Sequence, residues 1–495
     1  MRIASFDLAI IGVAIDPQST TPKHRQLYAR LREAVLADRL HAGDALPSTR
    51  ALALQVGVSR NTVLAAYEQL LAEGYLVGRA GSGTFVAPDA VRERFRRTTT
   101  HADVSSGGAE LAPMAKMLDD LRIRLPYPLA PPRAFQIAAA PIDLFPVATW
   151  ARLTARRLRN TRHELLSERE PLGYRPLREA IAAQLRNTRA VVCGADQIAV
   201  VSGAHTALFI CSMLLIGPDD AVWMEEPGYS AARGALRLHT REVVPVPVDA
   251  EGLDVREGLA LAPAPRLIYV TPSHQFPLGS TMTLRRRLDL LHVAEDAKAW
   301  IIEDDYDSEL RYDGRPIAAL QGLDRSGRVI YVGTFNKIAF QGLRIAYVVL
   351  PPSLVEPFTA ARYFVDEYPP AINQAVLADF LVEGHLARYI RNARVACAER
   401  QDCLLMRLKR KLGHLVRVEA SAAGGFLVAG LPENFDDVAL SVALGGAGVD
   451  VLPLSPFFAG RPTRRGLLLG YAAVELAAVR DGVDTIARVA ADMHR

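Results

Sequence analysis

Lysine is scarce in this chain, and its scarcity draws attention to one position. The 495 residues contain 58 lysines and arginines, of which six are lysines. Arginine therefore supplies nearly all of the ordinary positive charge. A guanidinium does not condense with an aldehyde, whereas a primary amine does, and burial lowers an amine's pKa until it is nucleophilic near neutral pH. Lys337, at a turn after an apolar strand, is thus a candidate for covalent chemistry; the alternative is an ordinary surface lysine.

Cysteine and long apolar runs are scarce as well. The four cysteines show neither metal-ligand spacing nor the density of a disulfide scaffold, which indicates reduced thiols in a cytoplasmic protein without a metal site. The apolar stretch Ala207–Gly217 is far shorter than the roughly 20 residues of a membrane span, so we expect no membrane partner. Phe6–Ile15 is interrupted by Asp7 and lacks a cleavage pattern, so we interpret it as a leader strand.

Length and charge predict several domains with different partners. A chain of 495 residues, half of them hydrophobic, exceeds one ordinary core and predicts two or three domains. The first hundred residues hold 13 basic and 9 acidic side chains, so the whole net charge of +4 lies there. A modest positive excess at one end favours a polyanionic partner at that end.

In the second half of the chain, two apolar strands are followed by turns that carry candidate cofactor-binding residues. Arg344 follows Lys337 by seven residues, just before another apolar strand. Asp304 ends the apolar stretch that begins at Ala299, where parallel α/β sheets place ligand-binding groups. A carboxylate against a pyridine nitrogen keeps that ring protonated, as pyridoxal phosphate sites require, and Tyr306 is placed to hydrogen-bond the ring's phenolic oxygen. We expect the remaining acids to lie in a solvated loop and helix N-cap: Asp305, Asp307 and Glu309.

A third segment supplies a phosphate cradle. Ile198–Ile210 follows the pattern of a strand, a turn of small residues and a helix, so the backbone N–H groups of Gly203, Ala204 and His205 are expected at a helix N-terminus. Arg344 is suited to complete the cradle, since a guanidinium binds phosphate through two parallel hydrogen bonds. An ordinary strand-to-helix turn has the same pattern, so the prediction depends on the ordered set of all these residues.

The N-terminal hundred residues predict a winged helix-turn-helix. Helical periodicity runs through Thr21–Ala42, a short helix follows at Ser48–Gln55, and a longer one spans Ser59–Gly74. The short glycine turn between the last two is typical of a helix-turn-helix. Two short strands around a glycine-rich tip, at Tyr75–Gly78 and Thr84–Val86, form the predicted wing.

The start of the longer helix is the predicted DNA-reading element. N-terminal residues of a recognition helix reach base edges or phosphates, and Arg60 is the strongest candidate there. Arginines on the preceding helix and beside the wing tip are better placed to anchor phosphates. Any single arginine among them has a solvated surface role as its alternative. The full predicted DNA-binding set is Arg50, Ser59, Arg60, Asn61, Thr62, Arg79 and Gly81.

These motifs resemble two known families. Arg25–Val86 resembles the DNA-binding domain of GntR-type regulators, on the segments Leu46-Pro-Ser-Thr-Arg-Ala-Leu-Ala, Ser59-Arg-Asn-Thr-Val and Gly81-Ser-Gly-Thr-Phe. The chain from about Ile142 onward resembles a fold-type I aminotransferase domain, on Asp143-Leu-Phe-Pro146, Gly173-Tyr-Arg-Pro-Leu-Arg, Glu226-Pro-Gly-Tyr229 and Thr271-Pro-Ser-His-Gln-Phe-Pro-Leu-Gly279. The two together, in this order, resemble the MocR group of GntR-type regulators.

The resemblance implies a fold and a division of the chain. We expect a large α/β domain with a mostly parallel sheet and a small C-terminal α+β subdomain, preceded by the winged helix-turn-helix. The expected divisions are a leader at 1–20, a DNA-binding domain at 21–87, a linker at 88–135 and an aminotransferase-like effector domain at 136–495.

The resemblance also implies roles for site residues. Lys337 would carry pyridoxal 5'-phosphate as an imine, and Tyr229 would stack on the ring, with core packing as its alternative. The family's pyridoxal-contacting asparagine lies in an Asn-Pro-Thr-Gly turn, which His274-Gln275-Phe276-Pro277 replaces here. Leu468 stands where these aminotransferases carry the arginine that binds the substrate carboxylate.

The implied function is a transcriptional regulator that senses pyridoxal phosphate itself, or an amino-group effector, through Lys337. A homodimer, typically head-to-tail, would read repeated half-sites in double-stranded DNA, spaced near multiples of one duplex turn of about 34–36 Å. A working aminotransferase is the rival interpretation, and Leu468 argues against it. A dimerisation scaffold with an empty site is a third.

Overall fold

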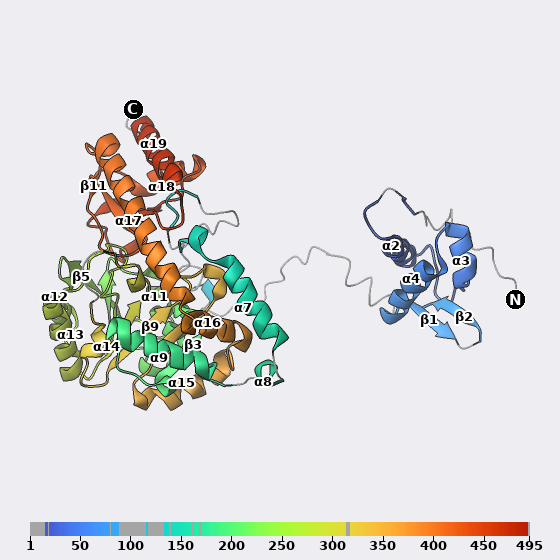
Figure 1. Ribbon diagram of the computed structural model, residues 1–495, viewed down its shortest axis with the longest axis horizontal. Coiled ribbons are helices and arrows are strands. Elements are labelled where there is room, and N and C mark those ends of the chain that lie inside the picture. Colours follow the sequence, from blue (N-terminus) through green and yellow to red (C-terminus); the bar gives the residue numbers. More distant parts are fainter. Residues whose placement is uncertain are drawn as a thin grey trace. The chain divides into compact units, whose positions relative to one another are not determined.

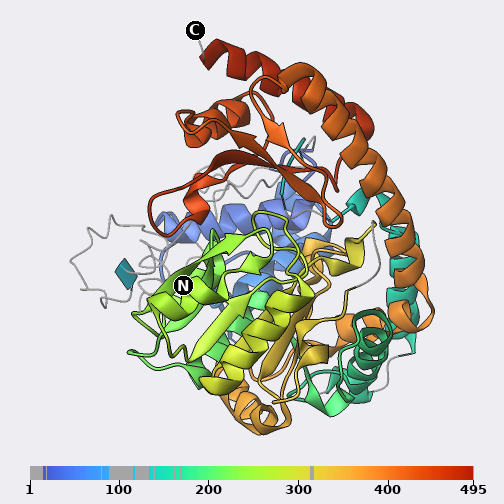
Figure 2. The same cartoon turned by 90° about the vertical axis from the view of Figure 1, so that its left-hand side faces the viewer.

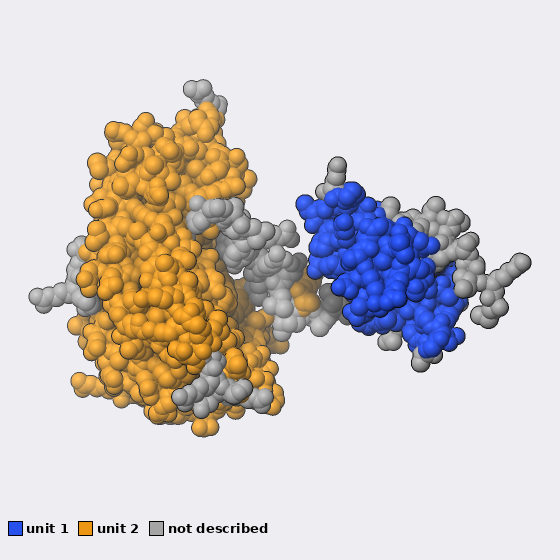
Figure 3. Space-filling model, turned by 45° about the vertical axis from the view of Figure 1, so that its right-hand side comes forward, with its two compact units in different colours: residues 1–112 blue, residues 113–495 orange. Residues whose placement is uncertain are grey.

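The computed structural model describes residues 15–17, 19–79, 81–88, 115–116, 133–137, 140–160, 163–167, 170–312 and 317–493. The chain divides into two compact units, residues 1–112 and 113–495 (Figure 3). Nearly all of the predicted leader strand Phe6–Ile15, and most of the predicted linker 88–135, lie outside the described residues.

The first unit is a winged helix-turn-helix, as predicted. Ser48 and Ser59 cap the second and third helices by accepting hydrogen bonds from the backbone N–H groups of Ala51 and Thr62, at 3.2 and 3.1 Å. Gly57 turns the chain between these helices with a φ of 68°, a left-handed value that favours glycine. The two wing strands pair antiparallel. The elements are α2 (Lys23–Leu36), α3 (Thr49–Val56), α4 (Arg60–Ala72), β1 (Leu76–Arg79) and β2 (Gly83–Val86) (Figure 1).

One apolar core holds this small unit together. Leu27 and Leu31 of α2 pack with Val63 and Leu70 of α4, and all four side chains are fully buried. Tyr67 is buried in the same core and donates a hydrogen bond to the Pro47 carbonyl at 3.0 Å. The polar N-terminus of α4 is consequently left on the surface of the unit.

The second unit is built on a large mixed sheet. Within the described residues, eight strands form it in the order β3-β10-β9-β8-β7-β4-β5-β6. The neighbours from β9 to β5 run parallel, β10 runs antiparallel to both β9 and β3, and β6 is antiparallel to β5. The strands are β3 (Ile198–Val201), β4 (Val222–Glu226), β5 (Val243–Asp249), β6 (Gly252–Leu253), β7 (Leu267–Val270), β8 (Trp300–Asp305), β9 (Val329–Thr334) and β10 (Ala346–Val349).

Helices cover both faces of this sheet, which explains why most of its strands are buried along their whole length. Along β9, Ile330 and Val332 pack in the cluster that contains α10, whereas Tyr331 packs in the opposite cluster with α9. The helices and turns of this part are η1 (Ile142–Leu144), α7 (Val147–Arg159), α8 (His163–Leu166), α9 (Arg175–Arg189), η2 (Ala195–Gln197), α10 (Ala204–Leu215), α11 (Ser230–Arg237), α12 (Val255–Leu261), α13 (Leu284–Asp296), η3 (Ser308–Leu310), α14 (Leu320–Leu323), η4 (Gln341–Leu343), α15 (Pro352–Val365) and α16 (Ala371–Val382).

A smaller C-terminal subdomain carries an antiparallel sheet. Its four strands in the described part of the chain follow the order β11-β12-β14-β13. The long helix α17 joins the two parts (Figure 2): Leu386 and Tyr389 near its start are buried in the large core, and Leu404 and Leu408 in the subdomain core. The elements are α17 (His385–Leu412), β11 (Arg417–Val418), β12 (Phe426–Leu431), α18 (Asp437–Gly446), β13 (Leu452–Pro453), η5 (Ser455–Phe457), β14 (Arg465–Gly470) and α19 (Leu476–Met493). The predicted fold class is confirmed.

Candidate functional site

Lys337 and Arg344 lie on one loop that joins β9 to the antiparallel strand β10. The loop closes on itself: Asn336 Oδ1 accepts a hydrogen bond from the Ile345 N–H at 3.0 Å, and the Phe335 N–H donates to the Ile345 carbonyl at 3.0 Å. Burial lowers the pKa of the Lys337 amine to about 8, although the carboxylates of Asp307 and Asp304 oppose that change. A substantial fraction of a lysine in this state is neutral near physiological pH.

Asp304 lies at the end of β8 and is almost fully buried. Its Oδ2 accepts a hydrogen bond from the Tyr269 hydroxyl at 2.7 Å, and its Oδ1 has no hydrogen-bond partner among the described residues. Burial raises the pKa of this carboxyl to about 6, because desolvation disfavours the charged form. A buried carboxylate oxygen without a donor is an acceptor available for a bound group.

The predicted phosphate cradle lies at the N-terminus of α10. Gly203 immediately precedes the helix, and a Cβ at that position would lie 3.1 Å from Nη2 of Arg344. The backbone N–H groups at the start of α10 and the guanidinium of Arg344 therefore lie close together. Nε2 of His205 lies 2.7 Å from the Tyr229 hydroxyl. Burial lowers the pKa of His205, and the charges of Arg344 and Lys337 lower it further, so these side chains share one neighbourhood.

The structure thus places the predicted cofactor residues in one cluster. They come from four segments: the start of α10, the turn before α11, the end of β8 and the loop before β10. The residues are Gly203, Ala204, His205, Tyr229, Asp304, Tyr306, Lys337 and Arg344. Two features were missing from the sequence analysis: the Tyr269 hydroxyl on Asp304, and the use of the His205 side chain rather than its backbone alone.

The expectation of a solvated acidic loop after β8 was wrong. Asp305 is buried, with one oxygen 2.8 Å from Nη2 of Arg189 and 2.6 Å from the Tyr331 hydroxyl. Asp307 is buried as well and pairs with His274 at 2.8 Å. Burial raises the pKa of Glu309 to about 7. Asp305 and Asp307 belong to the interior because basic and aromatic partners from distant segments reach them there.

In the turn His274-Gln275-Phe276-Pro277, the Gln275 side chain makes its hydrogen bonds within the protein. The Gln275 amide donates to Oε2 of Glu225 at 3.2 Å and to the Pro227 carbonyl at 2.9 Å, and its oxygen accepts from the Leu278 N–H at 2.9 Å. Burial raises the pKa of Glu225 to about 7. The Gln275 amide therefore holds the neighbouring turn in place.

Leu468, predicted to stand at the position of the carboxylate-binding arginine, lies in an apolar environment. It is fully buried on β14, in a cluster with Phe426, Phe457 and Phe458. The Phe276 ring extends this cluster to the cofactor residues, since it contacts the Tyr229 ring edge-on at a centroid distance of 5.6 Å. The nearby Arg465, on the same strand, donates a hydrogen bond to Asp437 at 3.2 Å.

The predicted DNA-contacting residues are exposed or half-buried on the first unit. Ser59 Oγ lies 2.8 Å from Oγ1 of Thr62 at the start of α4, and Arg60 Nε contacts Oγ1 of Thr49 at 3.4 Å. Arg79 lies over the Phe85 ring of the wing, with its guanidinium 4.9 Å from the ring centroid. Gly81, at the wing tip, has a φ of 75°. The exposed residues Arg50 and Asn61 complete the predicted set.

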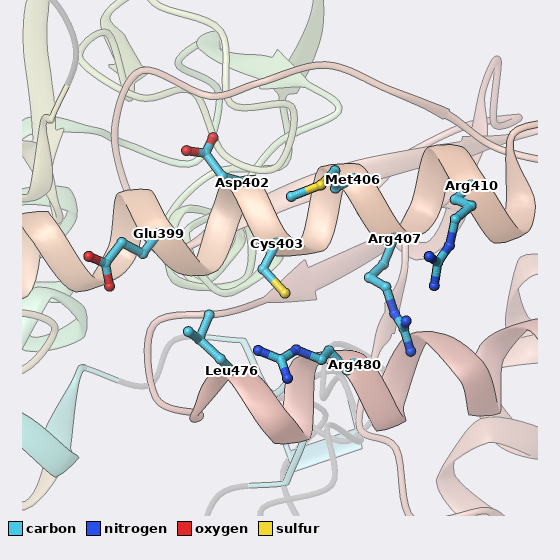
Figure 4. A pocket seen from close by; sticks show the side chains of 8 residues that line it. All are labelled: Glu399, Asp402, Cys403, Met406, Arg407, Arg410, Leu476 and Arg480. Carbon is cyan, nitrogen blue, oxygen red and sulfur yellow. The ribbon is translucent and has the colours of Figure 1, made fainter.

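A groove of about 450 Å³ lies apart from these residues, between α17 and α19. Figure 4 shows Cys403 and Arg407 of α17 directed toward Leu476 and Arg480 of α19. Arg407 is occupied by an ion pair with Asp484 at 2.7 Å. None of the predicted cofactor residues lines this groove, so it is not the candidate site. Among the described residues, moreover, no helix is long and apolar enough to cross a bilayer, and no acid, His or Cys cluster is suited to hold a metal.

The fold and its two sites define a class of protein: a winged helix-turn-helix joined to an aminotransferase-like domain. Two family models match accordingly, "Bacterial regulatory proteins, gntR family" over residues 23–86 and "Aminotransferase class I and II" over residues 144–485. The chain belongs to the MocR-type branch of the GntR family of DNA-binding transcriptional regulators, as the relatives described next establish. The GntR domain is a DNA-binding domain, and the aminotransferase-like fold is that of a pyridoxal phosphate-dependent family.

Three similar proteins illustrate this membership. The probable rhizopine catabolism regulatory protein MocR of Rhizobium meliloti is 42% identical over 96% of this chain and 95% of its own. The pyridoxine biosynthesis regulator PdxR of Corynebacterium glutamicum is 30% identical over 94% and 95%. The solved structure of the α-aminoadipate aminotransferase LysN from Thermus thermophilus, complexed with N-(5'-phosphopyridoxyl)-L-leucine, is 28% identical with a TM-score of 0.66, over 72% of this chain and 91% of that chain.

The residues of the cluster fit the cofactor that this fold family uses. The partnerless Oδ1 of buried Asp304 matches a protonated ring nitrogen. A side chain at Gly203 would contact Arg344, and the space that the glycine leaves open there suits a phosphate at a helix N-terminus. The lowered pKa of Lys337 matches an amine that condenses with an aldehyde.

Proposed function

We propose that this chain regulates transcription in response to pyridoxal 5'-phosphate bound at Lys337. The observation that carries the proposal is the convergence of Asp304, Lys337 and the Gly203–Arg344 cradle in a chain that also contains a GntR-type winged helix. Bound pyridoxal phosphate supplies an aldehyde that condenses with primary amines and a ring that withdraws electrons. The residues of this chain bind its phosphate, hold a proton at its ring nitrogen and present the amine.

The signal in this proposal is either the cofactor itself or a primary amine that replaces Lys337 on it. Either one acts only if it binds two arrangements of the protein with different affinity. The apolar surroundings of Leu468 disfavour an effector whose carboxylate needs a buried arginine at that point. They favour pyridoxal phosphate, or an amine without an α-carboxylate, as the effector.

We further infer a homodimer that places two winged helices on repeated half-sites. In each, the exposed N-terminus of α4 would enter the major groove, with Arg60 at a base or phosphate and Arg50 and Arg79 on phosphates. Contacts to phosphates orient the domain, and sequence preference would come from the start of α4.

The direct test is covalent trapping. Purified full-length protein incubated with pyridoxal phosphate and reduced with borohydride should carry a pyridoxyl group on the Lys337 peptide. Lys337→Ala should lose it, and Lys409→Ala, which removes an exposed lysine on α17, should keep it. A gel-shift with the chain's own upstream DNA should then respond to the cofactor in the wild-type protein and in Lys409→Ala, and not in Lys337→Ala. Absence of the adduct on Lys337 would refute the sensing proposal, and steady conversion of amino acids into keto acids would favour the enzyme instead.

A further inference from the structure

His274 lies where the large sheet meets the C-terminal subdomain, and the function proposed above assigns it no role. It follows β7 and is 2% exposed. Its Nδ1 lies 2.8 Å from Oδ2 of Asp307 and 3.1 Å from the hydroxyl of Tyr306. Its Nε2 lies 3.3 Å from Oγ of Ser421. One buried imidazole therefore touches a carboxylate, a cofactor-facing phenol and the subdomain.

The carboxylate determines where the imidazole hydrogen lies. An ionised carboxylate only accepts hydrogen bonds, so the 2.8 Å contact to Asp307 requires a hydrogen on Nδ1. That nitrogen consequently has no lone pair in the ring plane for Tyr306. The Tyr306 oxygen, at 3.1 Å, must accept in this contact, and its own hydrogen is free to point elsewhere.

The phenol is suited to use that hydrogen as a donor. Burial raises the pKa of Tyr306 well above its ordinary value, so the hydroxyl keeps its proton across the physiological range. Tyr306 is also the residue that the cofactor proposal places at the phenolic oxygen of the ring. Because His274 does not use the Tyr306 hydrogen, that hydrogen is available for donation toward the cofactor.

The subdomain locks this pair in place. A Cβ at Gly424 would lie 2.3 Å from Cε1 of His274 and 2.7 Å from Oδ2 of Asp307, so the backbone there lies flush against both side chains. The Phe426 ring, at the start of β12, lies 5.0 Å from the imidazole between centroids. Displacement of this part of the subdomain would therefore open the space that holds the imidazole.

We propose that His274 is a positioning residue that, held by Asp307 and by the Gly424 segment of the C-terminal subdomain, directs the Tyr306 hydroxyl toward the phenolic oxygen of bound pyridoxal phosphate. In this role it does not touch the cofactor itself and acts through Tyr306. This inference rests on the proposed cofactor function. It makes the electronic state of the cofactor depend on where the subdomain lies.

The test measures the pH midpoint of the imine absorption band in full-length protein loaded with pyridoxal phosphate. Donation to the phenolic oxygen stabilises its deprotonated form, so loss of the donor should raise the midpoint. For a hydrogen bond of ordinary strength, the rise is about half to one pH unit. His274→Phe and Tyr306→Phe should both show it. The double variant should match Tyr306→Phe alone, because the histidine acts through the tyrosine.

Conservative variants separate positioning from mere packing. His274→Asn, whose amide nitrogen takes the place of Nδ1, should keep a midpoint close to wild type, whereas His274→Gln, which reaches the Nε2 position instead, should behave like His274→Phe. The matched control is His292→Asn on α13, which removes an exposed histidine 3.7 Å from Asp296 and should change nothing. The comparison of His274→Asn with His274→Gln tests the positioning role even if His274→Phe does not fold. An unchanged midpoint in His274→Gln, or additive effects in the double variant, would overturn the inference, whereas a wild-type protein without the absorption band would overturn the proposed function itself.

Discussion

Replacing Asp304 by asparagine should weaken cofactor binding without weakening the empty protein. The carboxylate has one oxygen on Tyr269 and one without a partner, and burial raises its pKa from 3.8 to about 6. A charge-assisted hydrogen bond to the ring nitrogen is worth about 1.5–3 kcal/mol, so Asp304→Asn should bind pyridoxal phosphate about tenfold to a hundredfold more weakly.

In the empty protein, the charge of Asp304 lowers stability. A carboxyl whose folded pKa is raised costs nothing below its unfolded pKa, and its full cost is present above its folded pKa. The change from 3.8 to about 6 corresponds to about 3 kcal/mol of destabilisation of the empty protein at pH 7. Asparagine removes this cost and adds about 1–3 kcal/mol for an amide without a partner, so the net change is small.

The pH dependence of stability separates the cost of the buried carboxylate charge from the cost of the unpaired asparagine amide. Between pH 5 and pH 7.5, the free energy of unfolding of wild-type protein should fall by about 1.4 kcal/mol relative to Asp304→Asn. Denaturation followed by tryptophan fluorescence is selective for this domain, because all three tryptophans, Trp150, Trp223 and Trp300, lie in the second unit.

Asp305→Asn is the matched control. It breaks a buried pair with Arg189 and should destabilise the domain by about 3–5 kcal/mol at every pH tested. The reasoning fails if empty Asp304→Asn is as unstable as Asp305→Asn, if the pH difference is absent, or if cofactor affinity is unchanged.

Three further predictions concern the cradle and the DNA-binding surface. Gly203→Ala should bring a methyl group to 3.1 Å from Arg344 and reduce cofactor retention, measured by dialysis and absorbance, while thermal unfolding of the empty protein stays near wild type. Arg60→Ala should cost about 1–3 kcal/mol of specific DNA affinity, measured by fluorescence anisotropy, and should leave the cofactor absorbance unchanged. The control Arg30→Ala, at a half-exposed position on α2, should have little effect. Equal losses in the two variants would contradict a recognition role for α4. DNA affinity should fall steeply with salt, by about 0.9 decade per decade of salt for each phosphate contact, and Arg50→Ala should reduce that slope by about one contact; a flat response would contradict phosphate anchoring.

Local patterns in the sequence were sufficient for much of the fold. Helices α3 and α4 of the winged domain have serine caps and a glycine turn within a few residues of each other, so short-range chemistry determines where they begin and end. The positions of Asp304 and Lys337 were predictable as well, since Asp304 lies near the end of one apolar strand and Lys337 follows another within a few residues.

Long-range partners were not predictable in this way. Asp305 appeared solvated in the sequence, but Arg189, 116 residues earlier, reaches it in the interior. His274 and Asp307 are 33 residues apart and carry no local signal of their pairing. Such contacts depend on how β7 and β8 are placed beside each other in the sheet, which periodicity alone does not encode.

Helix α17 has a mechanical consequence. With 28 residues it is about 42 Å long, and its ends are buried in two different cores. A tilt of about 5° at one end would carry the other through about 4 Å if the rod stays straight. A small tilt of α17 at the end beside the large sheet would thus move its other end, in the C-terminal subdomain, by several ångströms.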